Sequence, residues 1–449
     1  MITMTLSELG QCVNGEGVFG NAFFRGVAID SRRVRKGNLF AALAGTRSDG
    51  HDFIHSAMDE GAVVALVNRR VNLDIDQVVV ADVQAALGSM ARYWRAKIDP
   101  RVIGITGSNG KTTTKEMVSS ILSIHHATHA TQGNYNNELG VPLTVFELDE
   151  AHEFAVIEMG ANKSGDIAYL AEIAAPGIGL VTNIGPAHLE GFGDELGVAR
   201  AKGELYAALP QDGWAVINAE EPYRTLWQDM CTADQHLTFG RCADSDIRAE
   251  RQGSEWAIHA PSGSFQLKLD MPGEHNVMNA VAATAVAVAA GVPLDQIQAG
   301  LDRVRSVPGR LNRRVAPEGW TVIDDTYNAN PASLYAAMQV LVDTAGVTWL
   351  VLGDMAELGA QSRKLHAEMG EAARTLGIDR LFSVGEFSEA SADAFGTGAS
   401  HFADINALMA ALLADLEPSV HCLVKGSRSM GMERVVEALT HASGVRGAV

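Results

Sequence analysis

Residues 101–114, RVIGITGSNGKTTT, decide the fold of the middle of the chain. Residues 101–106 are mostly apolar and β-branched, which predicts a buried strand. A glycine-rich turn comes next, and Val118, Ile121 and Leu122 then recur at helical spacing. A strand, a tight glycine turn and a helix in this order point backbone N–H groups and the helix dipole at an anion. The stretch therefore predicts an α/β domain that carries a phosphate-binding loop.

The residue types within this loop indicate a nucleoside triphosphate. Lys111 is placed to reach the outer phosphates, and the hydroxyl of Thr112 is placed to hold Mg²⁺. The general phosphate-loop pattern has a glycine five residues before Gly110, where this chain has Ile105. The loop is therefore a shorter variant that begins at Gly107. A plain strand–turn–helix connection is the alternative, and the Gly-Lys-Thr sequence disfavours it.

Strand-like and helix-like runs alternate along the rest of the chain. The expected strands include residues 154–159 (FAVIEM), 179–184 (GLVTNI), 348–352, 381–384 and 421–424, with helical patterns between them. Repeated strand–helix alternation predicts parallel sheets covered by helices on both faces. Turn signals at residues 98–100 (IDP) and 307–310 (VPGR) divide the chain into segments 1–98, 99–310 and 311–449. We expect both larger segments to be doubly wound.

Composition excludes several classes of protein. The 449 residues include 35 Lys plus Arg and 54 Asp plus Glu, so the net charge of −19 argues against broad nucleic-acid binding. Four cysteines without metal-type spacing indicate a reduced, cytoplasmic setting. The N-terminus does not resemble a signal peptide, and the longest apolar run, residues 280–292, is too short to span a bilayer. We therefore expect a cytoplasmic protein without membrane insertion.

Three further positions carry chemistry but remain ambiguous when each is taken alone. Glu158 ends an expected strand, where it is either a Mg²⁺ ligand or a solvated rim residue. His188 comes after another expected strand, at the edge where α/β sheets bind ligands, and is either a site residue or a turn residue. Lys202 interrupts the apolar stripe of a helix. It is either a lysine that snorkels to solvent or one placed in a site with a lowered pKa.

Taken together and in order, the motifs resemble the Mur ligase family of ATP-dependent peptide ligases over essentially the whole chain. They are TGSNGKTTTKE, EMGA, NIGPAHLEGFG, ARAKGELY, HNVMNAVAA and DDTYNANPAS. DSRRVRKGNLFAALAGTRSDGHDF, QGNYNNELGVPLT, LGDMAELG and LVKGSRSM narrow the resemblance within the family. They imply an enzyme that adds D-alanyl-D-alanine to UDP-N-acetylmuramoyl-tripeptide through an acyl phosphate. Its products are the UDP-N-acetylmuramoyl-pentapeptide, ADP and phosphate, in peptidoglycan precursor synthesis.

The resemblance also implies an architecture of three domains. Residues 1–98 form a smaller N-terminal α/β domain for the UDP-substrate, and residues 99–310 form the doubly wound phosphate-loop ATPase-type domain. Residues 311–449 form a Rossmann-like domain that receives the dipeptide and closes over ATP. We expect a monomer whose partners are small molecules.

The resemblance assigns roles to the nucleotide and metal residues. The ATP-binding residues are Gly107, Ser108, Asn109, Gly110, Lys111, Thr112, Thr113, Asn276, Asn279, Arg310 and Asp325. Thr112 and Glu158 hold one Mg²⁺, whereas His188 and Lys202 hold a second. Lys202 matches a lysine that family members carry as a carbamate, and the catalytic set is Lys111, His188 and Lys202.

The resemblance assigns substrate residues as well. Ser31, Arg32, Thr46, Asp49, Gly50 and His51 resemble the uridine-diphosphate pocket, and Asn134 and Asn137 lie near the sugar-peptide portion. Tyr327, Asn328, Asn330, Lys425 and Arg428 are candidates for the dipeptide, whose carboxylate needs a cation.

Three competing functions make different demands on the sequence. A ligase that adds a single diamino acid to the UDP-muramoyl-dipeptide expects a DNPR-like motif, which the sequence lacks. A folate or polyglutamate ligase shares the central domain but lacks the DSR and DGH motifs. A phosphate-loop NTPase that acts as a switch gives no reason for the long N-terminal segment. The sequence features favour the dipeptide ligase.

Overall fold

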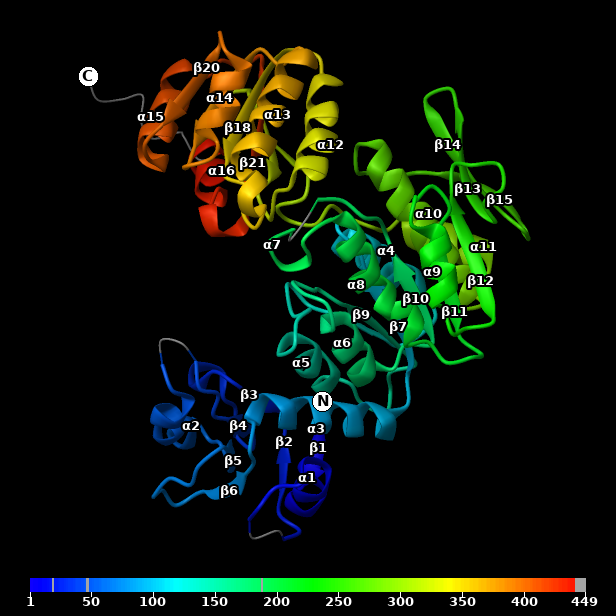
Figure 1. The fold of residues 1–449 in the computed structure, drawn as a ribbon, viewed down its shortest axis with the longest axis vertical. Coiled ribbons are helices and arrows are strands. Elements are labelled where there is room, and N and C mark those ends of the chain that lie inside the picture. The colour runs from blue at the N-terminus through cyan, green and yellow to red at the C-terminus, as the bar shows by residue number, and fades with distance from the viewer. Residues whose placement is uncertain (18–19, 46–47, 187–188, 441–449) are drawn as a thin grey trace.

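The computed structural model describes residues 1–17, 20–45, 48–186 and 189–440. The chain forms three successive bodies, each built around its own main sheet. The first and last bodies lie at opposite ends of the long axis, and the central body joins them (Figure 1). Within the described residues, no helix has the length and apolar character needed to cross a bilayer.

The N-terminal body combines two small sheets with three α-helices. β1 (Thr3–Thr5) pairs antiparallel with β2 (Phe23–Arg25). β3 (Val27–Ala28), β4 (Leu39–Ala41), β5 (Val64–Val67) and β6 (Asp76–Val79) form a parallel sheet in chain order. The α-helices are α1 (Leu6–Val13), α2 (Ile54–Asp59) and α3 (Val83–Ile98), and η1 (Ser31–Arg33) and η2 (Gly50–Phe53) are short 3₁₀ turns.

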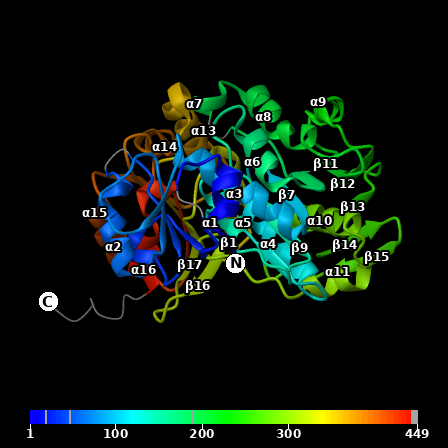
Figure 2. The ribbon, with the colours of Figure 1, turned by 90° about the horizontal axis from the view of Figure 1, so that it is seen from below.

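Helix α3 joins the N-terminal and central bodies in one hydrophobic core. The Asp82 side chain accepts a hydrogen bond from Ala85 N at its start, and Asp99 ends it with a left-handed backbone. Its apolar face packs against α5 (Gly140–Phe146) and α6 (Asp166–Ala174), and Trp94 Nε1 donates to Leu148 O at 3.0 Å. The view from below shows α3 beside α5 (Figure 2). The N-terminal body is therefore packed against the central one rather than tethered to it.

The central body holds a nine-stranded sheet in the order β15-β14-β13-β12-β11-β10-β7-β9-β8. The parallel strands are β7 (Arg101–Thr106), β8 (Thr128–Ala130), β9 (Phe154–Glu158), β10 (Ile178–Val181), β11 (Trp214–Asn218), β12 (Gln235–Gly240) and β13 (Ile247–Gln252). β14 (Glu255–Ala260) and β15 (Gly263–Leu267) continue the edge as antiparallel strands. The remaining helices are α4 (Lys111–Leu122), α7 (Leu189–Phe192), α8 (Glu195–Ala207), α9 (Arg224–Met230), α10 (Glu274–Ala289) and α11 (Leu294–Leu301).

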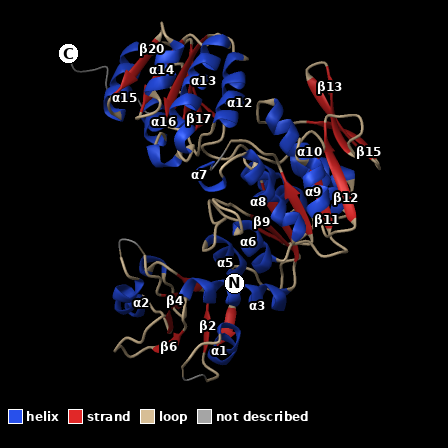
Figure 3. Ribbon diagram, viewed as in Figure 1, coloured by secondary structure: helices blue, strands red, loops and turns tan. Residues whose placement is uncertain are grey.

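The C-terminal body holds a six-stranded sheet in the order β16-β17-β21-β18-β19-β20. Its strands are β16 (Asn312–Val315), β17 (Thr321–Asp325), β18 (Val347–Gly353), β19 (Arg380–Val384), β20 (Ala399–Phe402) and β21 (Val420–Lys425), and only β16 is antiparallel. Helices α12 (Pro331–Val342), α13 (Ser362–Thr375), α14 (Glu389–Phe395), α15 (Ile405–Asp415) and α16 (Glu433–Thr440) surround it, with η3 (Gly359–Gln361) and η4 (Arg428–Met430) as short turns. Figure 3 shows these helices around the strands.

The predicted fold class is confirmed. The strand expected at residues 101–106 has those bounds, and the other expected strands shift by one to three residues at their ends. Two apolar cores, one on each face of the C-terminal sheet, agree with a doubly wound arrangement. The antiparallel strands β14–β15 and β16 were not anticipated. The sequences of β15 (GSFQL) and β16 (NRRV) are short and mostly polar, so they resemble loops.

Candidate active site

The phosphate-binding loop, residues 107–111, connects β7 to α4 and depends on two glycines with positive φ. Gly107 has φ +140° and Gly110 has φ +77°. A Cβ at Gly107 would lie 1.9 Å from Thr182 Oγ1, and one at Gly110 would lie 2.3 Å from Asn279 Oδ1. A side chain at either position would therefore clash as well as strain the backbone. Thr182 and Asn279 therefore occupy the space that side chains at Gly107 and Gly110 would need.

The end of β10 holds the loop in shape. Asn183 Oδ1 accepts from Asn109 N at 3.0 Å, and Asn183 Nδ2 donates to Asn109 O at 3.1 Å. Thr182 Oγ1 also donates to Asn109 O, at 2.6 Å. These two residues were not predicted as site residues. Their position at the carboxyl end of a central strand next to β7 is the signal that could have identified them.

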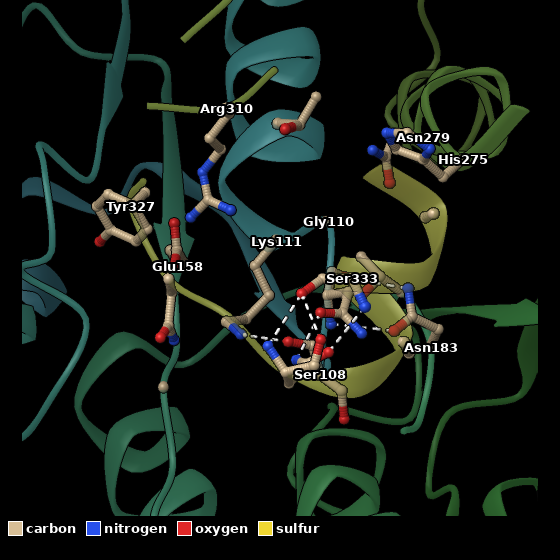
Figure 4. Close-up of a pocket in the computed structure, with 18 of the residues that line it drawn as sticks. Ser108, Gly110, Lys111, Glu158, Asn183, His275, Asn279, Arg310, Tyr327 and Ser333 are labelled. Carbon is tan, nitrogen blue, oxygen red and sulfur yellow. Dashed lines mark hydrogen bonds between the residues drawn. The ribbon is translucent and has the colours of Figure 1, made fainter. Parts of the chain in front are cut away.

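Lys111 bends back onto its own loop. Its Nζ donates to Gly107 O at 2.7 Å and to Ser108 O at 3.3 Å. Figure 4 shows Lys111 beside Ser108. Burial lowers the pKa of Lys111, nearby Glu158 opposes that shift, and Arg310 adds to it. The amine therefore has only neutral carbonyl acceptors, and an anion bound at the loop could replace them.

Thr112 and Glu158 face each other as predicted for a Mg²⁺ site. Thr112 Oγ1 donates to Glu158 Oε2 at 2.9 Å, and Asn136 Nδ2 donates to Glu158 Oε1 at 2.8 Å. Glu158 is only 1% exposed, so the alternative of a solvated rim residue is wrong. Arg310 Nη2 donates to Thr112 Oγ1 at 3.0 Å. The two oxygen-bearing side chains thus converge at the start of α4.

The chemistry of these residues fits Mg²⁺ bound together with a nucleotide. Mg²⁺ prefers oxygen ligands and is commonly held by one or two protein groups, phosphates and water. Thr112 and Glu158 supply that limited protein set. Among the described residues, no cluster of three His, Cys, Asp or Glu side chains forms a metal site independent of a nucleotide. Arg310 Nε is buried and has no hydrogen-bond partner in the described part of the chain, which suits an arriving phosphate.

Lys202 lies on α8 with its amine buried. The residue is 2% exposed, so the alternative of snorkelling to solvent is wrong. Burial, reinforced by nearby Lys111, lowers its pKa to about 7 against the opposing charges of Asp166, Glu204 and Glu158. His188, the predicted partner of Lys202 at a second Mg²⁺, lies outside the described residues, as does Thr46 of the predicted uridine-diphosphate pocket.

The C-terminal body contacts the phosphate loop through Asn330 and contacts Arg310 through Tyr327. Asn330 Nδ2 donates to Asn109 Oδ1 at 2.8 Å, while Asn330 Oδ1 caps α12 by accepting from Ser333 N. The guanidinium of Arg310 lies 4.2 Å from the ring centroid of Tyr327, and Figure 4 shows both beside Glu158. Asn330, predicted as a dipeptide residue, therefore contacts the nucleotide loop in this arrangement.

The two predicted dipeptide cations have different surroundings. Lys425 is buried, forms an ion pair with Asp325 and donates to Asn328 O at 2.9 Å. The side chain of Arg428 is 67% exposed and pairs with Glu433 at 3.4 Å. The charge of Lys425 is already balanced within the fold, whereas Arg428 makes an exposed pair that costs little to exchange.

A cavity of about 720 Å³ brings most of the predicted site together between the central and C-terminal bodies. Predicted residues that line it are Ser108, Asn109, Gly110, Lys111, Thr113, Asn134, Asn137, Glu158, Lys202, Asn276, Asn279, Arg310, Asp325, Tyr327, Asn328, Asn330 and Lys425. Unpredicted polar residues that line it are Asn136, Glu138, Asn162, Asp166, Thr182, Asn183, Asn218, Glu220, Glu221, His275 and Ser333. The predicted residues Gly107, Thr112 and Arg428 do not line the cavity.

The predicted uridine-diphosphate residues that the structure describes lie on the N-terminal body, in two hydrogen-bonded groups. Asp49 Oδ1 lies 2.6 Å from His51 Nδ1, and Arg69 Nη2 donates to Asp49 Oδ2 at 2.7 Å. Arg69 was not predicted. Buried Ser31 and exposed Arg32 belong to η1, where Arg32 makes two side-chain hydrogen bonds to Asp30. Gly50 abuts the Leu43 backbone, so it has no room for a side chain.

Comparisons with known proteins agree with this architecture. The Mur ligase family catalytic domain matches residues 24–98, the Mur ligase middle domain residues 105–287, and the Mur ligase glutamate ligase domain residues 309–428. A UDP-N-acetylmuramoyl-tripeptide–D-alanyl-D-alanine ligase of Escherichia coli (strain K12) is 43% identical over 98% of this chain and 99% of its own. The crystal structure of MurF from Acinetobacter baumannii has a TM-score of 0.91, 37% identity and coverage of 98% and 99%. MurF ligase from Thermotoga maritima, solved in complex with ADP, has a TM-score of 0.83, 30% identity and coverage of 93% and 97%. This chain belongs to the Mur ligase family.

Proposed function

We propose that the protein joins D-alanyl-D-alanine to UDP-N-acetylmuramoyl-tripeptide at the expense of ATP. The observation that carries this proposal is the cavity itself: the phosphate loop, Glu158 and residues of the C-terminal body line one space. The identity to whole-length relatives named for this reaction supports the choice of substrates. The related ligase that adds a single diamino acid remains the second candidate in the family, and its structure is only 18% identical to this chain.

The first half of the reaction transfers the γ-phosphoryl group to the terminal carboxylate of the tripeptide. Lys111 leaves the Gly107 carbonyl to pair with the phosphates, and the amides of the loop and of α4 surround them. Arg310, whose Nε is free of partners among the described residues, adds a second cation. When bound, Mg²⁺ neutralises phosphate charge; we propose that Thr112 and Glu158 hold one ion. These groups reduce the electrostatic repulsion between ATP and the terminal carboxylate of the tripeptide.

In the second half, the free amine of the dipeptide attacks the acyl phosphate, and phosphate leaves. An acyl phosphate hydrolyses in water, so the site has to exclude solvent. The bond from Asn330 to Asn109 ties the C-terminal body to the loop at the edge of the cavity. We assign the carboxylate of the dipeptide to Arg428 rather than Lys425, because Asp325 already balances Lys425.

The remaining finer assignments are part of the same proposal. We also propose domain limits of 1–98, 99–310 and 311–449, a cytoplasmic monomer, and a second Mg²⁺ at His188 and Lys202. With a pKa of about 7, the Lys202 amine is largely neutral just above neutral pH. Its lone pair can then attack CO₂, forming an N–C bond with loss of one proton, and the resulting carbamate offers oxygen ligands to a hard metal.

A phosphate-release assay tests the function. Phosphate should appear from ATP and Mg²⁺ only when UDP-muramoyl-tripeptide and D-alanyl-D-alanine are both present. Lys111→Ala should abolish release, whereas the matched variant Lys97→Ala, which loses a partly exposed pair with Glu8 and a contact with the Trp94 ring far from the cavity, should not. Equal rates with single amino acids would refute the dipeptide assignment, and release without any acceptor would favour a plain NTPase.

A further inference from the structure

Lys115 is a buried lysine that the proposed reaction leaves unused. It lies on α4 one turn after Lys111, and its side chain is 1% exposed. Its Nζ donates to Thr131 O and pairs with Glu116 Oε1 at 2.7 Å. Burying a cation is costly even when it is paired. Such a residue calls for an explanation beyond packing.

Thr131, whose carbonyl accepts the hydrogen bond from Lys115, lies directly after the last residue of the edge strand β8. β8 pairs in parallel with β9 in a register that aligns Ala130 with Val156. One residue further on, Thr131 N donates to Val156 O at 3.0 Å, which continues the ladder. In a parallel ladder, the next acceptor for Glu158 N would be Thr131 O.

That bond is replaced by a side-chain bond. Glu158 N donates to Thr131 Oγ1 at 2.9 Å, while Thr131 O accepts from Lys115 instead. The lysine therefore draws the carbonyl out of the ladder, and the hydroxyl of the same residue takes its place. The amide of Glu158 is held by this exchange.

The exchange also directs the chain beyond Thr131. Residues 132–137 turn away from the sheet and return to the carboxylate, where Asn136 Nδ2 donates to Glu158 Oε1. Asn136 O in turn accepts from Gly160 N at 2.7 Å, just after β9. Backbone and carboxylate of Glu158 are thus both fixed by the segment that Lys115 anchors.

We propose that Lys115 is a positioning residue of the metal site, which acts through Thr131 to set the carboxylate of Glu158. This inference rests on the proposed role of Glu158 as a Mg²⁺ ligand. Groups that orient metal ligands commonly contribute about 10- to 100-fold in metal affinity or activity. Lys115 does not line the cavity, so we expect its effect to be on geometry.

The Lys115→Met variant distinguishes an effect on the geometry of Glu158 from an effect of the lysine's charge. The two effects change Mg²⁺ affinity in opposite directions. Loss of a nearby cation by itself would tighten Mg²⁺ binding at the Glu158 carboxylate. Loss of the hydrogen bond to Thr131 O lets this carbonyl return to the ladder and releases Glu158, which weakens Mg²⁺ binding. We expect the free Mg²⁺ concentration for half-maximal ADP binding, measured by calorimetry, to rise about 10-fold.

Thr131 gives an independent test if Lys115→Met fails to fold. Thr131→Val removes the hydroxyl that holds Glu158 N and should raise the Mg²⁺ requirement in the same way, whereas Thr131→Ser keeps the hydroxyl and should stay near wild type. Glu116→Gln is the matched control, since it removes the exposed half of the ion pair but leaves the bond to Thr131.

The outcomes separate this inference from the proposed function. Folded Lys115→Met and Thr131→Val variants with an unchanged or lowered Mg²⁺ requirement would overturn the positioning role. If ADP binding by the wild-type protein shows no Mg²⁺ dependence, the proposed metal role of Glu158 fails first. If the wild type needs Mg²⁺ and Thr131→Ser behaves like Thr131→Val, the hydroxyl is not the holding group and the inference is refuted.

Discussion

Replacing Lys202 by methionine should stabilise the metal-free protein while removing its activity. The amine is 2% exposed, and burial with the nearby charge of Lys111 lowers its pKa from 10.5 to about 7. The folded protein therefore disfavours the charged amine that the unfolded chain carries. Methionine fills a similar volume without charge, so the substitution removes this penalty and leaves little cavity.

The size and pH dependence of the effect can be worked out from the shift. A change from 10.5 to about 7 is about 3.5 pH units, which corresponds to about 5 kcal/mol at about 1.36 kcal/mol per unit. Between these two values the unfolded chain binds a proton that the folded chain lacks, so stability falls as pH drops through this window and levels off below about 7. The gain from Lys202→Met should thus be about 5 kcal/mol at about pH 6 and about 2 kcal/mol at about pH 9.

Denaturant unfolding at about pH 6 and about pH 9, without divalent metal and in CO₂-free buffer, measures this gain. Lys97→Met, at an exposed site, is the control and should show no comparable pH-dependent gain. A Lys202→Met protein that is less stable than wild type at the lower pH, or whose gain does not shrink at the higher pH, would refute the reasoning. Recovery of Lys202→Ala activity by short-chain carboxylic acids would support the carbamate, and its failure would count against it.

Three further predictions concern the loop, the contact between bodies and the N-terminal cluster. Gly107→Ala should abolish ADP binding measured by calorimetry, because its Cβ would lie 1.9 Å from Thr182 Oγ1 at a φ of +140°; binding close to that of wild type would contradict this. Asn330→Ala should lose about 1 kcal/mol from the α12 cap as well as turnover, whereas Asn330→Asp keeps the cap but loses the donor to Asn109, so turnover should fall with an unchanged melting temperature. Asp49→Asn weakens the bonds to His51 and Arg69 that hold the pKa of Asp49 below its usual range; it should raise KM for the UDP-substrate without changing KM for ATP, and the reverse pattern would show that the cluster serves another purpose.

The sequence predicts best those parts of the fold that rest on local physics. The composition of residues 102–106 is enough to predict that they are buried, and the glycine turn after them leads directly into the first turn of α4. The strands β14 and β15 could not be predicted in the same way. Exposed residues alternate with buried ones in β15, and only pairing with β14 and β13 gives those residues a reason to be extended.

In the candidate site, too, residues within local motifs could be predicted, whereas their partners from distant parts of the chain could not. Lys111, Thr112 and Glu158 were predicted from motifs, since each lies at the end of a regular element. Their partners come from elsewhere in the chain: Asn136 reaches Glu158 from a loop 22 residues away. The pairing of Lys425 with Asp325 depends on the register of β17 against β21, which aligns these two residues although 100 positions separate them. No local pattern reveals such a pair.

The net charge of −19 can be reconciled with two polyanionic substrates by considering the cavity lining. Six carboxylates (Glu138, Glu158, Asp166, Glu220, Glu221 and Asp325) line it against four basic side chains (Lys111, Lys202, Arg310 and Lys425). Lys425 and Asp325 neutralise each other, and the low pKa of Lys202 leaves it only partly charged. Glu220 pairs with Arg241, and burial raises the pKa of Glu221 to about 7, so Glu138, Glu158 and Asp166 remain as the acidic lining. Lys111 and Arg310 then remain to face a triphosphate and a carboxylate. Two cations cannot balance that charge in a partly buried site, which supports the proposed divalent cation. The acidic lining therefore favours strict Mg²⁺ dependence. The carboxylates that repel phosphate also attract Mg²⁺, and the bound ion offsets the negative charge of the phosphates.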